Sequence, residues 1–262
     1  MTDPLAIKRH CKVAVVLPAF NAAKTLKQTV QEIPREWVDC IILVDDASQD
    51  QTATLARQLG LYVVEHARNR GYGGNQKTCY QEALAQGAEI VVMVHPDYQY
   101  DPRQIPQLIT PILLGECDAV LGSRMLGGKF LQGGMPVWKF YGNVLLTALA
   151  NLVLKVFFSE YHSGFRAYSR RYLETVNFLA NSEDFVFDME ILIQGIIHEL
   201  RICEIPISTR YPPEASQIGV LKSLKYAGSI LVVLTRFWIH RRGWHRFKSF
   251  APMSSNPVDP LT

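Results

Sequence analysis

The stretch MVHPDYQYDP, residues 93–102, places three side chains that could bind a metal ion close together. His95, Asp97 and Gln99 follow an apolar run, where a buried strand would reach a surface loop. In an extended loop, Asp97 and Gln99 point the same way and can reach one cation. Mg²⁺ and Mn²⁺ prefer oxygen ligands, and His95 would suit Mn²⁺ better than Mg²⁺. Taken alone, the stretch is more often a polar turn than a metal site.

Two further polar stretches could contact a nucleotide. Asp45 and Asp46 end the apolar run CIILVDD, where a carboxylate can accept a hydrogen bond from a nucleobase or a ribose; capping of the next helix is the alternative. The stretch NRGYGGNQK, residues 69–77, includes Gly74 and Lys77 and opens a predicted helix, so its backbone N–H groups could approach a phosphate. It matches neither the P-loop motif nor the dinucleotide-binding GxGxxG motif, so alone it is a weak signal.

Strand and helix signals alternate through the first half of the chain. The predicted strands are 12–20, 40–48, 61–67 and 89–95, and the predicted helices are 22–33, 50–60 and 75–87. Such alternation predicts right-handed crossovers and a mostly parallel sheet. Ligands of open parallel sheets bind beyond the carboxyl ends of the strands. The polar loops should therefore converge on one rim and form a nucleotide pocket.

The second half is less regular. Its predicted elements are a strand at 118–124, a glycine-rich loop at 127–134, an apolar helix, a helix at 183–202, a strand at 203–211, a loop at 212–219 and a disordered tail at 251–262. The apolar segment 144–158 contains Asn151 and Lys155 and is shorter than the roughly 18 residues of a membrane span, which predicts a buried or interfacial helix.

Residues 221–248 form a predicted helical stretch that is basic and rich in aromatic residues. Its end, TRFWIHRRGWHRFK, contains five Lys or Arg residues together with Phe237, Trp238, Trp244 and Phe247. This composition is typical of a helix in an anionic membrane interface. A solvated basic helix with aromatic side chains in the core is the alternative.

Composition narrows the class of protein. A net charge of +3 over 262 residues gives no argument for nucleic-acid binding. The five cysteines are scattered without a CxxC pair, which indicates free thiols in a reducing compartment. Charged residues precede the first short apolar run, so no signal peptide is predicted. We expect a cytoplasmic protein, with any membrane attachment peripheral and on the inner face.

The order of the motifs resembles family 2 glycosyltransferases with the GT-A fold. The motifs are VVLPAFNAAKTL, LVDDASQDQT, NRGYGGNQK, HPDYQYDP, LGSR and SGFRAY, and the resemblance covers roughly residues 12–215. The dolichyl-phosphate mannose synthase and polyprenyl-phosphate glycosyltransferase group is the most similar branch. The resemblance implies a Rossmann-like α/β fold. We expect a catalytic domain at 1–220, a C-terminal helical segment at 221–250 and a tail at 251–262.

The resemblance also implies roles for individual residues. The expected nucleotide-sugar contacts are Pro18, Ala19, Phe20, Asn21, Asp45, Asp46, Gly74, Lys77, Arg124 and Arg166. Asp97 and Gln99 would hold Mn²⁺ or Mg²⁺ on the donor diphosphate. Two positions depart from the family pattern: His95 replaces the first aspartate of DxDxQ, and the usual Asn-Glu pair is Asn21-Ala22.

The implied reaction is inverting transfer from a nucleotide sugar. Asp97, Asp188 and Arg124 are the expected catalytic residues. A polyprenyl or dolichyl phosphate acceptor is already an anion and needs no general base, whereas a glycan or other hydroxyl acceptor needs a carboxylate such as Asp188 or Glu190. A nucleotidyltransferase and a non-catalytic nucleotide-sugar binding module are the competing hypotheses.

Overall fold

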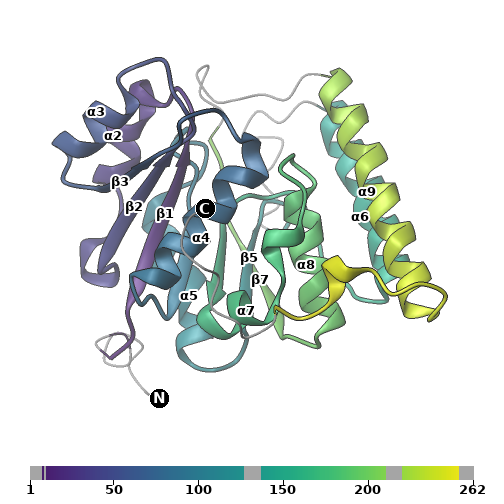
Figure 1. Ribbon diagram of the computed structural model, residues 1–262. Helices are drawn as coiled ribbons and strands as arrows, with labels where there is room; N and C mark the ends of the chain where they lie inside the picture. The colour runs from purple at the N-terminus through teal and green to yellow at the C-terminus, as the bar shows by residue number, and fades with distance from the viewer. Residues whose placement is uncertain (1–7, 9, 127–136, 211–219, 254–262) are drawn as a thin grey trace.

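The computed structural model describes residues 8, 10–126, 137–210 and 220–253, and these form one mixed sheet flanked by helices (Figure 1). The sheet has the strand order β3-β2-β1-β4-β6-β5-β7. The strands are β1 Val13–Ala19, β2 Cys40–Asp45, β3 Tyr62–Glu65, β4 Ile90–Met93, β5 Ala119–Ser123, β6 Arg166–Ser169 and β7 Ile202–Pro206. Only β6 runs antiparallel to its neighbours, which confirms the predicted mostly parallel sheet.

Helices cover both faces of the sheet. They are α2 Ala23–Gln31, α3 Thr52–Gln58, α4 Gly71–Ala85, α5 Ile105–Leu113, α6 Val137–Leu154, α7 Arg170–Thr175, α8 Phe187–Ile197 and α9 Val220–Arg241. In β1, Ala14 and Val16 pack into one core while Val13 and Val15 pack into the other. Because both faces of this strand are buried, its sequence is a continuous apolar run without polar alternation.

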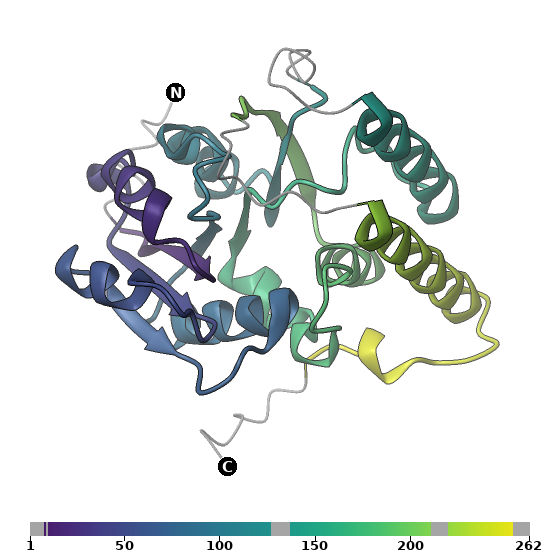
Figure 2. The same cartoon turned by 90° about the horizontal axis from the view of Figure 1, so that it is seen from above.

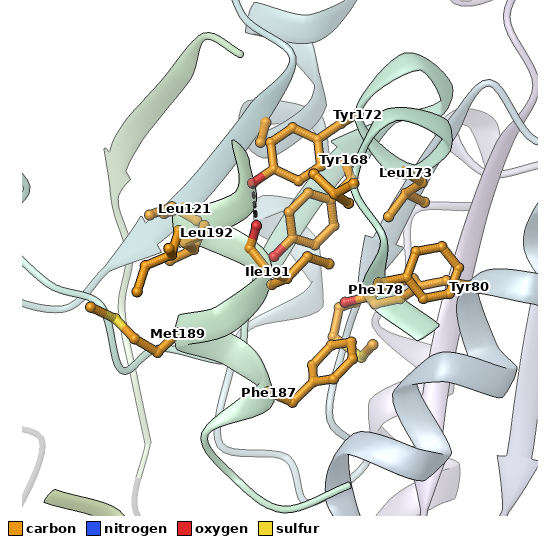
Figure 3. Packing of buried hydrophobic residues seen from close by; sticks show 14 of the residues in the cluster. Tyr80, Leu121, Tyr168, Tyr172, Leu173, Phe178, Phe187, Met189, Ile191 and Leu192 are labelled. Carbon is orange, nitrogen blue, oxygen red and sulfur yellow. Dashed lines mark hydrogen bonds between the residues drawn. The ribbon is translucent and has the colours of Figure 1, made fainter. Parts of the chain in front are cut away.

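An aromatic cluster forms the core on one face of the sheet. Tyr80, Tyr168, Tyr172, Phe178 and Phe187 pack against one another there (Figure 3). The Tyr172 hydroxyl donates to the carbonyl oxygen of Ile191 at 3.0 Å, so this buried polar group is paired. The cluster joins α4, α7 and α8 to the sheet and thereby fixes the helices that carry site residues.

Several boundaries differ from the sequence predictions. Helix α4 begins at Gly71, four residues before the predicted start, so the glycine-rich stretch forms the first turn of the helix. Strand β6 and helices α5 and α7 had no sequence prediction. Helix α9 ends at Arg241, and Gly243 has a φ of 73°, where the chain turns back. The predicted loops at 127–134 and 212–219 and most of the predicted tail lie outside the described residues.

Helices α6 and α9 lie side by side along one edge of the molecule, next to α8 (Figure 2). Both expose large apolar side chains, including Tyr141, Leu145 and Leu152 of α6 and Leu224 and Val232 of α9. No helix within the described ranges combines the length and the apolar character needed to cross a membrane.

Candidate active site

The polar loops meet where β1, β2 and β4 end. Ala19, the last residue of β1, lies in register with Asp45, the last residue of β2. The Asn75 side chain of α4 donates to the Ala19 carbonyl oxygen at 3.4 Å, and the Thr25 hydroxyl of α2 donates to the Pro96 carbonyl oxygen at 2.6 Å. These bonds tie the loops after all three strands to the flanking helices. The predicted convergence of the polar loops on one rim is confirmed.

Asp45 carries a buried carboxylate with one unpaired oxygen. Its side chain lies at the carboxyl end of β2, and the residue is 3% exposed. Oδ2 accepts the Ser48 backbone N–H at 2.9 Å, whereas Oδ1 has no hydrogen-bond partner among the described residues. A buried carboxylate oxygen without a partner is costly, because it has lost water without gaining a donor. A ligand N–H at this position would supply the missing hydrogen bond.

The loop after β1 is joined to the loop after β2. Asn21 donates its backbone N–H to the Ser48 hydroxyl at 2.8 Å, and its side-chain oxygen accepts the Gln49 N–H at 2.8 Å. Pro18 and Ala19 are buried as the last residues of β1, whereas Phe20 is 54% exposed beside them. Phe20 directly follows Ala19, which lies in register with Asp45, and its exposed aromatic ring is available to stack on a nucleobase.

Asp46 anchors the chain that precedes α4. Its carboxylate accepts hydrogen bonds from His66 Nδ1 at 2.7 Å, from the Arg70 N–H at 2.7 Å and from the Gly71 N–H at 3.0 Å. These contacts fix the loop between β3 and α4 against the end of β2. The expected contact of Asp46 with a ribose stays a prediction.

The glycines of α4 allow the chain at 182–187 to approach closely. The Gly73 N–H donates to the Glu183 carbonyl oxygen at 2.8 Å. A Cβ added at Gly73 would lie 2.4 Å from the Ser182 carbonyl oxygen and 2.9 Å from Phe187 Cβ. The sequence analysis suggested that these glycines let backbone N–H groups approach a phosphate. In the structure, Gly73 instead lies close to residues 182–187.

Gly74 and Lys77 also face the segment that leads into α8. A Cβ on Gly74 would lie 3.5 Å from the Glu183 side chain. Lys77 is buried, its ammonium donates to the Asn181 carbonyl oxygen, and burial lowers its pKa. The expected donor contacts of both residues stay predictions, because the described contacts serve packing between α4 and residues 181–183.

The stretch 93–102, which contains the three predicted metal ligands, includes a tight turn. Tyr98 has a φ of 60°, and Asp97 Oδ1 accepts the Gln99 N–H at 3.0 Å. The expectation of an extended loop is therefore wrong, since a left-handed residue separates the two predicted ligands. The turn is held from outside: the Arg210 guanidinium lies 4.3 Å from the Tyr98 ring centroid, and the Arg210 N–H donates to the Gln99 carbonyl oxygen.

His95 is packed between an aromatic ring and a glycine. Its ring stacks on Tyr72, with centroids 5.4 Å apart and planes 17° apart. A Cβ on Gly164 would lie 2.4 Å from His95 Nε2, so only glycine fits there. Burial lowers the pKa of His95, while the nearby carboxylates of Asp97 and Asp188 act in the opposite direction.

The described residues offer a divalent cation only a sparse set of ligands. They contain no group of three or more His, Cys, Asp or Glu side chains placed to hold a metal ion. Asp97 uses one oxygen in the turn, and its other oxygen and the Gln99 side chain have no hydrogen bond to a described residue. Such a donor set fits Mg²⁺ or Mn²⁺ held largely by a diphosphate and water, with few protein ligands, drawn from His95, Asp97 and Gln99.

Asp188 and Glu190, the two predicted bases, are both engaged. Asp188 accepts the Tyr72 hydroxyl at 2.6 Å and the Gln76 side-chain N–H at 3.1 Å. Glu190 accepts the Ser182 N–H at 2.6 Å, and burial raises its pKa. Asp188 thus lies inside the site network, whereas Glu190 supports the 182–187 segment.

The two predicted phosphate-binding arginines are also paired within the protein. Arg166 is 1% exposed and donates to the carbonyl oxygens of Ser163 at 2.6 Å, Tyr161 at 2.6 Å and Asp188 at 2.8 Å. Arg124 donates from Nε to the buried Glu160 carboxylate at 2.8 Å. Their expected phosphate contacts stay predictions.

Three partners in this network had no sequence prediction: Tyr72, Gln76 and Glu160. Tyr72 and Gln76 stand within the stretch 69–77 that the sequence singled out, but their types gave no sign of pairing with Asp188, more than 110 residues away. Glu160 follows a predicted helix in a segment without a motif. Only the folded chain brings these groups together.

Comparison with known proteins identifies relatives of this chain. Residues 14–176 match the model of the family described as Glycosyl transferase family 2. The chain is 32% identical over 200 residues to an uncharacterized protein of Methanocaldococcus jannaschii, covering 76% of this chain and 82% of that protein. It is 29% identical to the UDP-N-acetylglucosamine–dolichyl-phosphate N-acetylglucosaminyltransferase of Methanococcus voltae, covering 76% and 86%. It is 25% identical to the polyprenol monophosphomannose synthase of Mycolicibacterium smegmatis, covering 79% and 80%.

Solved structures share the fold. The glucosyl-3-phosphoglycerate synthase of Mycobacterium tuberculosis, crystallised with Mn²⁺ and UDP-glucose, superposes with a TM-score of 0.69 over 89% of this chain and 81% of that chain. Sequence identity to it is 22%, so the likeness concerns the fold alone. The GT-A-like α/β architecture predicted from the motifs is confirmed.

Proposed function

Since the chain belongs to glycosyl transferase family 2 and is a glycosyltransferase, we propose that it moves a sugar from a nucleoside-diphosphate sugar to a polyprenyl or dolichyl phosphate, with inversion at the anomeric carbon. The observation that carries the donor assignment is the unpaired, buried Oδ1 of Asp45 at the rim of the sheet. A nucleobase N–H would pair this oxygen, and Phe20 would stack on the base.

The diphosphate of the donor would lie over the turn at residues 96–99. Asp97 and Gln99 would hold the divalent cation there, and the bound cation would offset negative charge on the departing nucleoside diphosphate. Neither side chain is committed elsewhere beyond the one Asp97 oxygen in the turn. The acceptor oxygen would then attack the anomeric carbon from the face opposite the leaving group.

The hydrogen bonds already made by Asp188 and Glu190, the two predicted bases, favour a phosphate acceptor. A hydroxyl acceptor must lose a proton to a nearby base, whereas a lipid phosphate is already an anion. Both oxygens of Asp188 accept hydrogen bonds, and Arg166 lies 3.8 Å from one of them. Glu190 accepts a backbone N–H on the adjoining segment. Both oxygens of Asp188 are thus engaged, and Glu190 is held on the segment before α8, which supports an acceptor that needs no base.

The surface of α6 and α9 suits a lipid-borne acceptor. Neither helix contains an Asp or Glu residue. Leu145 and Leu152 of α6 are 71% and 76% exposed, and Trp238 of α9 lies beneath the Arg242 guanidinium at 5.0 Å. A surface that combines exposed apolar side chains with basic side chains and lacks acidic ones is typical of contact with an anionic membrane. We place the protein as a peripheral enzyme on the inner face of the membrane.

The proposal is tested by a matched pair of acceptors. Purified protein is incubated with a panel of nucleotide sugars, Mn²⁺ or Mg²⁺, and either a polyprenyl phosphate or the polyprenol of the same length. We expect a lipid-linked sugar phosphate with the phosphate only, and NMR of the product should show an anomeric configuration opposite to that of the donor. Equal transfer to the polyprenol would exclude the phosphate acceptor. Binding of a nucleotide sugar without transfer or hydrolysis would support a non-catalytic binding module.

A further inference from the structure

Tyr72 connects a carboxylate and a histidine that lie on different elements. Its hydroxyl donates to Asp188 Oδ2 of α8 at 2.6 Å. The same hydroxyl oxygen lies 3.2 Å from Nε2 of His95, which follows β4. Tyr72 itself belongs to the first turn of α4, so a single hydroxyl joins three elements at the rim.

The hydrogen-bond count fixes which nitrogen of His95 carries the proton. A tyrosine hydroxyl has one proton, and an ionised carboxylate can only accept, so the Tyr72 proton lies between Tyr72 and Asp188. The hydroxyl oxygen then faces His95 Nε2 with a lone pair. A lone pair on Nε2 would repel the lone pair of the Tyr72 hydroxyl oxygen. In the neutral ring, Nε2 therefore bears the proton and Nδ1 bears the lone pair. None of the described residues forms a hydrogen bond with Nδ1.

Packing holds the ring in this orientation. The Phe185 ring packs against Tyr72, which stacks on His95; the centroids of Phe185 and Tyr72 are 4.8 Å apart. Gly164 leaves room for Nε2, and its N–H is held by the Tyr100 hydroxyl at 3.0 Å. A ring flip of His95 would place a carbon where Nε2 now meets Tyr72 and would lose the hydrogen bond.

We propose that Tyr72 is a positioning residue that holds His95 in its Nε2–H form, so that the Nδ1 lone pair is the atom that binds the divalent cation. This inference rests on the proposed function for the presence of that cation. Metal-binding histidines are commonly oriented by a hydrogen bond from the other ring nitrogen, and loss of such a bond weakens metal affinity by about 10-fold to 100-fold. Here the orienting group is a tyrosine whose own proton is committed to Asp188.

The first experiment reads the tautomer without donor or metal. Long-range ¹H–¹⁵N NMR of the full chain distinguishes protonated from unprotonated ring nitrogens, and the His95→Asn variant assigns the signals by their loss. We expect Nε2–H in the wild type and a mixture of tautomers in Tyr72→Phe. Tyr62→Phe, an exposed tyrosine whose hydroxyl lies 3.4 Å from Glu82, is the control and should leave the His95 signals unchanged.

The second experiment measures the affinity for Mn²⁺ alone, by the EPR signal of the free ion. Asn places its amide oxygen near the position of Nδ1, whereas Gln places it near Nε2. We therefore expect His95→Asn to bind Mn²⁺ more tightly than His95→Gln, and Tyr72→Phe to bind about 10-fold more weakly than the wild type. In a His95→Asn background there is no tautomer to set, so Tyr72→Phe should have little further effect.

Three results overturn the inference: a wild-type His95 protonated at Nδ1, equal Mn²⁺ affinity of the Asn and Gln variants, or Mn²⁺ affinity of the wild type and Tyr72→Phe within twofold. If Tyr72→Phe fails to fold, the Asn and Gln pair still decides the ligand atom. Failure of every nucleotide sugar to react, with the tautomer and Mn²⁺ results as expected, would contradict the proposed function and leave this inference standing.

Discussion

At the scale of single residues, Asp45 and Asp97 occupy different environments within one rim. Asp45 is buried and has one oxygen without a partner among the described residues, whereas Asp97 is half-buried on a turn. Under the proposed function, the first would recognise the base in the ground state and the transition state alike. The second would act on charge that develops only as the donor bond breaks. Substitutions at the two positions should therefore change different kinetic constants.

We expect Asp45→Asn to raise KM for the donor about 10-fold and to leave kcat nearly unchanged, because a contact made equally in both states affects binding only. The Asn amide would present an N–H in place of one acceptor oxygen. Steady-state kinetics with Glu116→Gln, an exposed carboxylate far along the chain, as the control would check this. A large fall in kcat at constant KM would show that Asp45 acts in the chemical step.

Asp97→Ala should lower kcat by about 100-fold or more while the protein remains folded, because the charge of the leaving diphosphate would be poorly neutralised. Circular dichroism would confirm the fold, and kcat would be measured at saturating Mn²⁺. The Gln99 N–H loses its acceptor in this variant, so Asp97→Asn, which keeps an oxygen in the turn, is the matched control for turn geometry. Retention of more than half of the wild-type activity in both variants would contradict the assignment.

At the scale of elements, α4 and α9 each approach the segment before α8. The glycines of α4 bring that segment close, and α9 reaches it through the Lys225–Asp184 ion pair at 2.6 Å. Tyr226 of α9 also contacts His162 Nδ1 at 2.9 Å. A hollow of about 180 Å³ lies between α9 and residues 184–186 and is lined by Phe185 and Tyr226 among others. The position of α9 is thus coupled to residues beside Asp188.

Two glycine substitutions should have opposite effects on stability. Gly73→Ala places a methyl group 2.4 Å from the Ser182 carbonyl oxygen, so overpacking should cost about 1–3 kcal/mol of unfolding free energy despite the better helix propensity of alanine. Gly142→Ala, in α6 with nothing within 4 Å of the new Cβ, should stabilise by up to about 1 kcal/mol. Urea denaturation measures both. Equal effects at the two sites would contradict the close approach of residues 182–187 to α4.

His162 should make the fold sensitive to acid. Burial lowers the pKa of His162 to about 4, below the usual histidine value of 6.5, so the unfolded chain binds the proton first as the pH falls. Its contribution is fully present above pH 6.5 and is lost toward pH 4. Between pH 7 and pH 5 this group alone should remove about 2 kcal/mol of unfolding free energy. Urea denaturation of wild type and His162→Asn at both pH values should show a smaller loss in the variant; equal losses would exclude His162 as the cause.

At the scale of the whole molecule, the candidate site and the exposed apolar side chains of α6 and α9 lie on different parts of one sheet-based fold. The rim is formed where β1, β2 and β4 end, and α6 and α9 flank it beyond α8 (Figure 2). This arrangement would let a lipid phosphate reach the rim while its chain stays in the membrane.

The double variant Leu145→Glu/Leu152→Glu should bind about 10-fold less to vesicles that contain phosphatidylglycerol, because two exposed apolar contacts are replaced by charges that an anionic surface repels. Vesicle sedimentation measures the binding, with phosphatidylcholine vesicles for comparison. Leu114→Glu, at the end of α5 and 38% exposed, is the control for an added charge elsewhere. Unchanged sedimentation of the double variant would mean that another surface makes the contact.

The sequence by itself was sufficient to predict a mostly parallel sheet, the family and the convergence of the polar loops on one rim. Alternating apolar runs and helical periods are local properties, so they predicted four parallel strands and the loops that meet beyond them. The order of six motifs was sufficient for the family resemblance that the comparisons confirm. Strand β6 was not predicted. It runs antiparallel between β4 and β5, and the direction of a strand depends on its pairing with distant segments.

Only the tertiary structure decided what individual site residues touch. The glycines of the 69–77 stretch face residues 182–187, Asp46 binds the chain before α4, and Tyr72 lies between Asp188 and His95. These contacts join residues about 20 to more than 110 positions apart. The type of a residue gives its capacity to donate, accept or pack, but its partner is set by which elements the fold brings within about 3 Å of it.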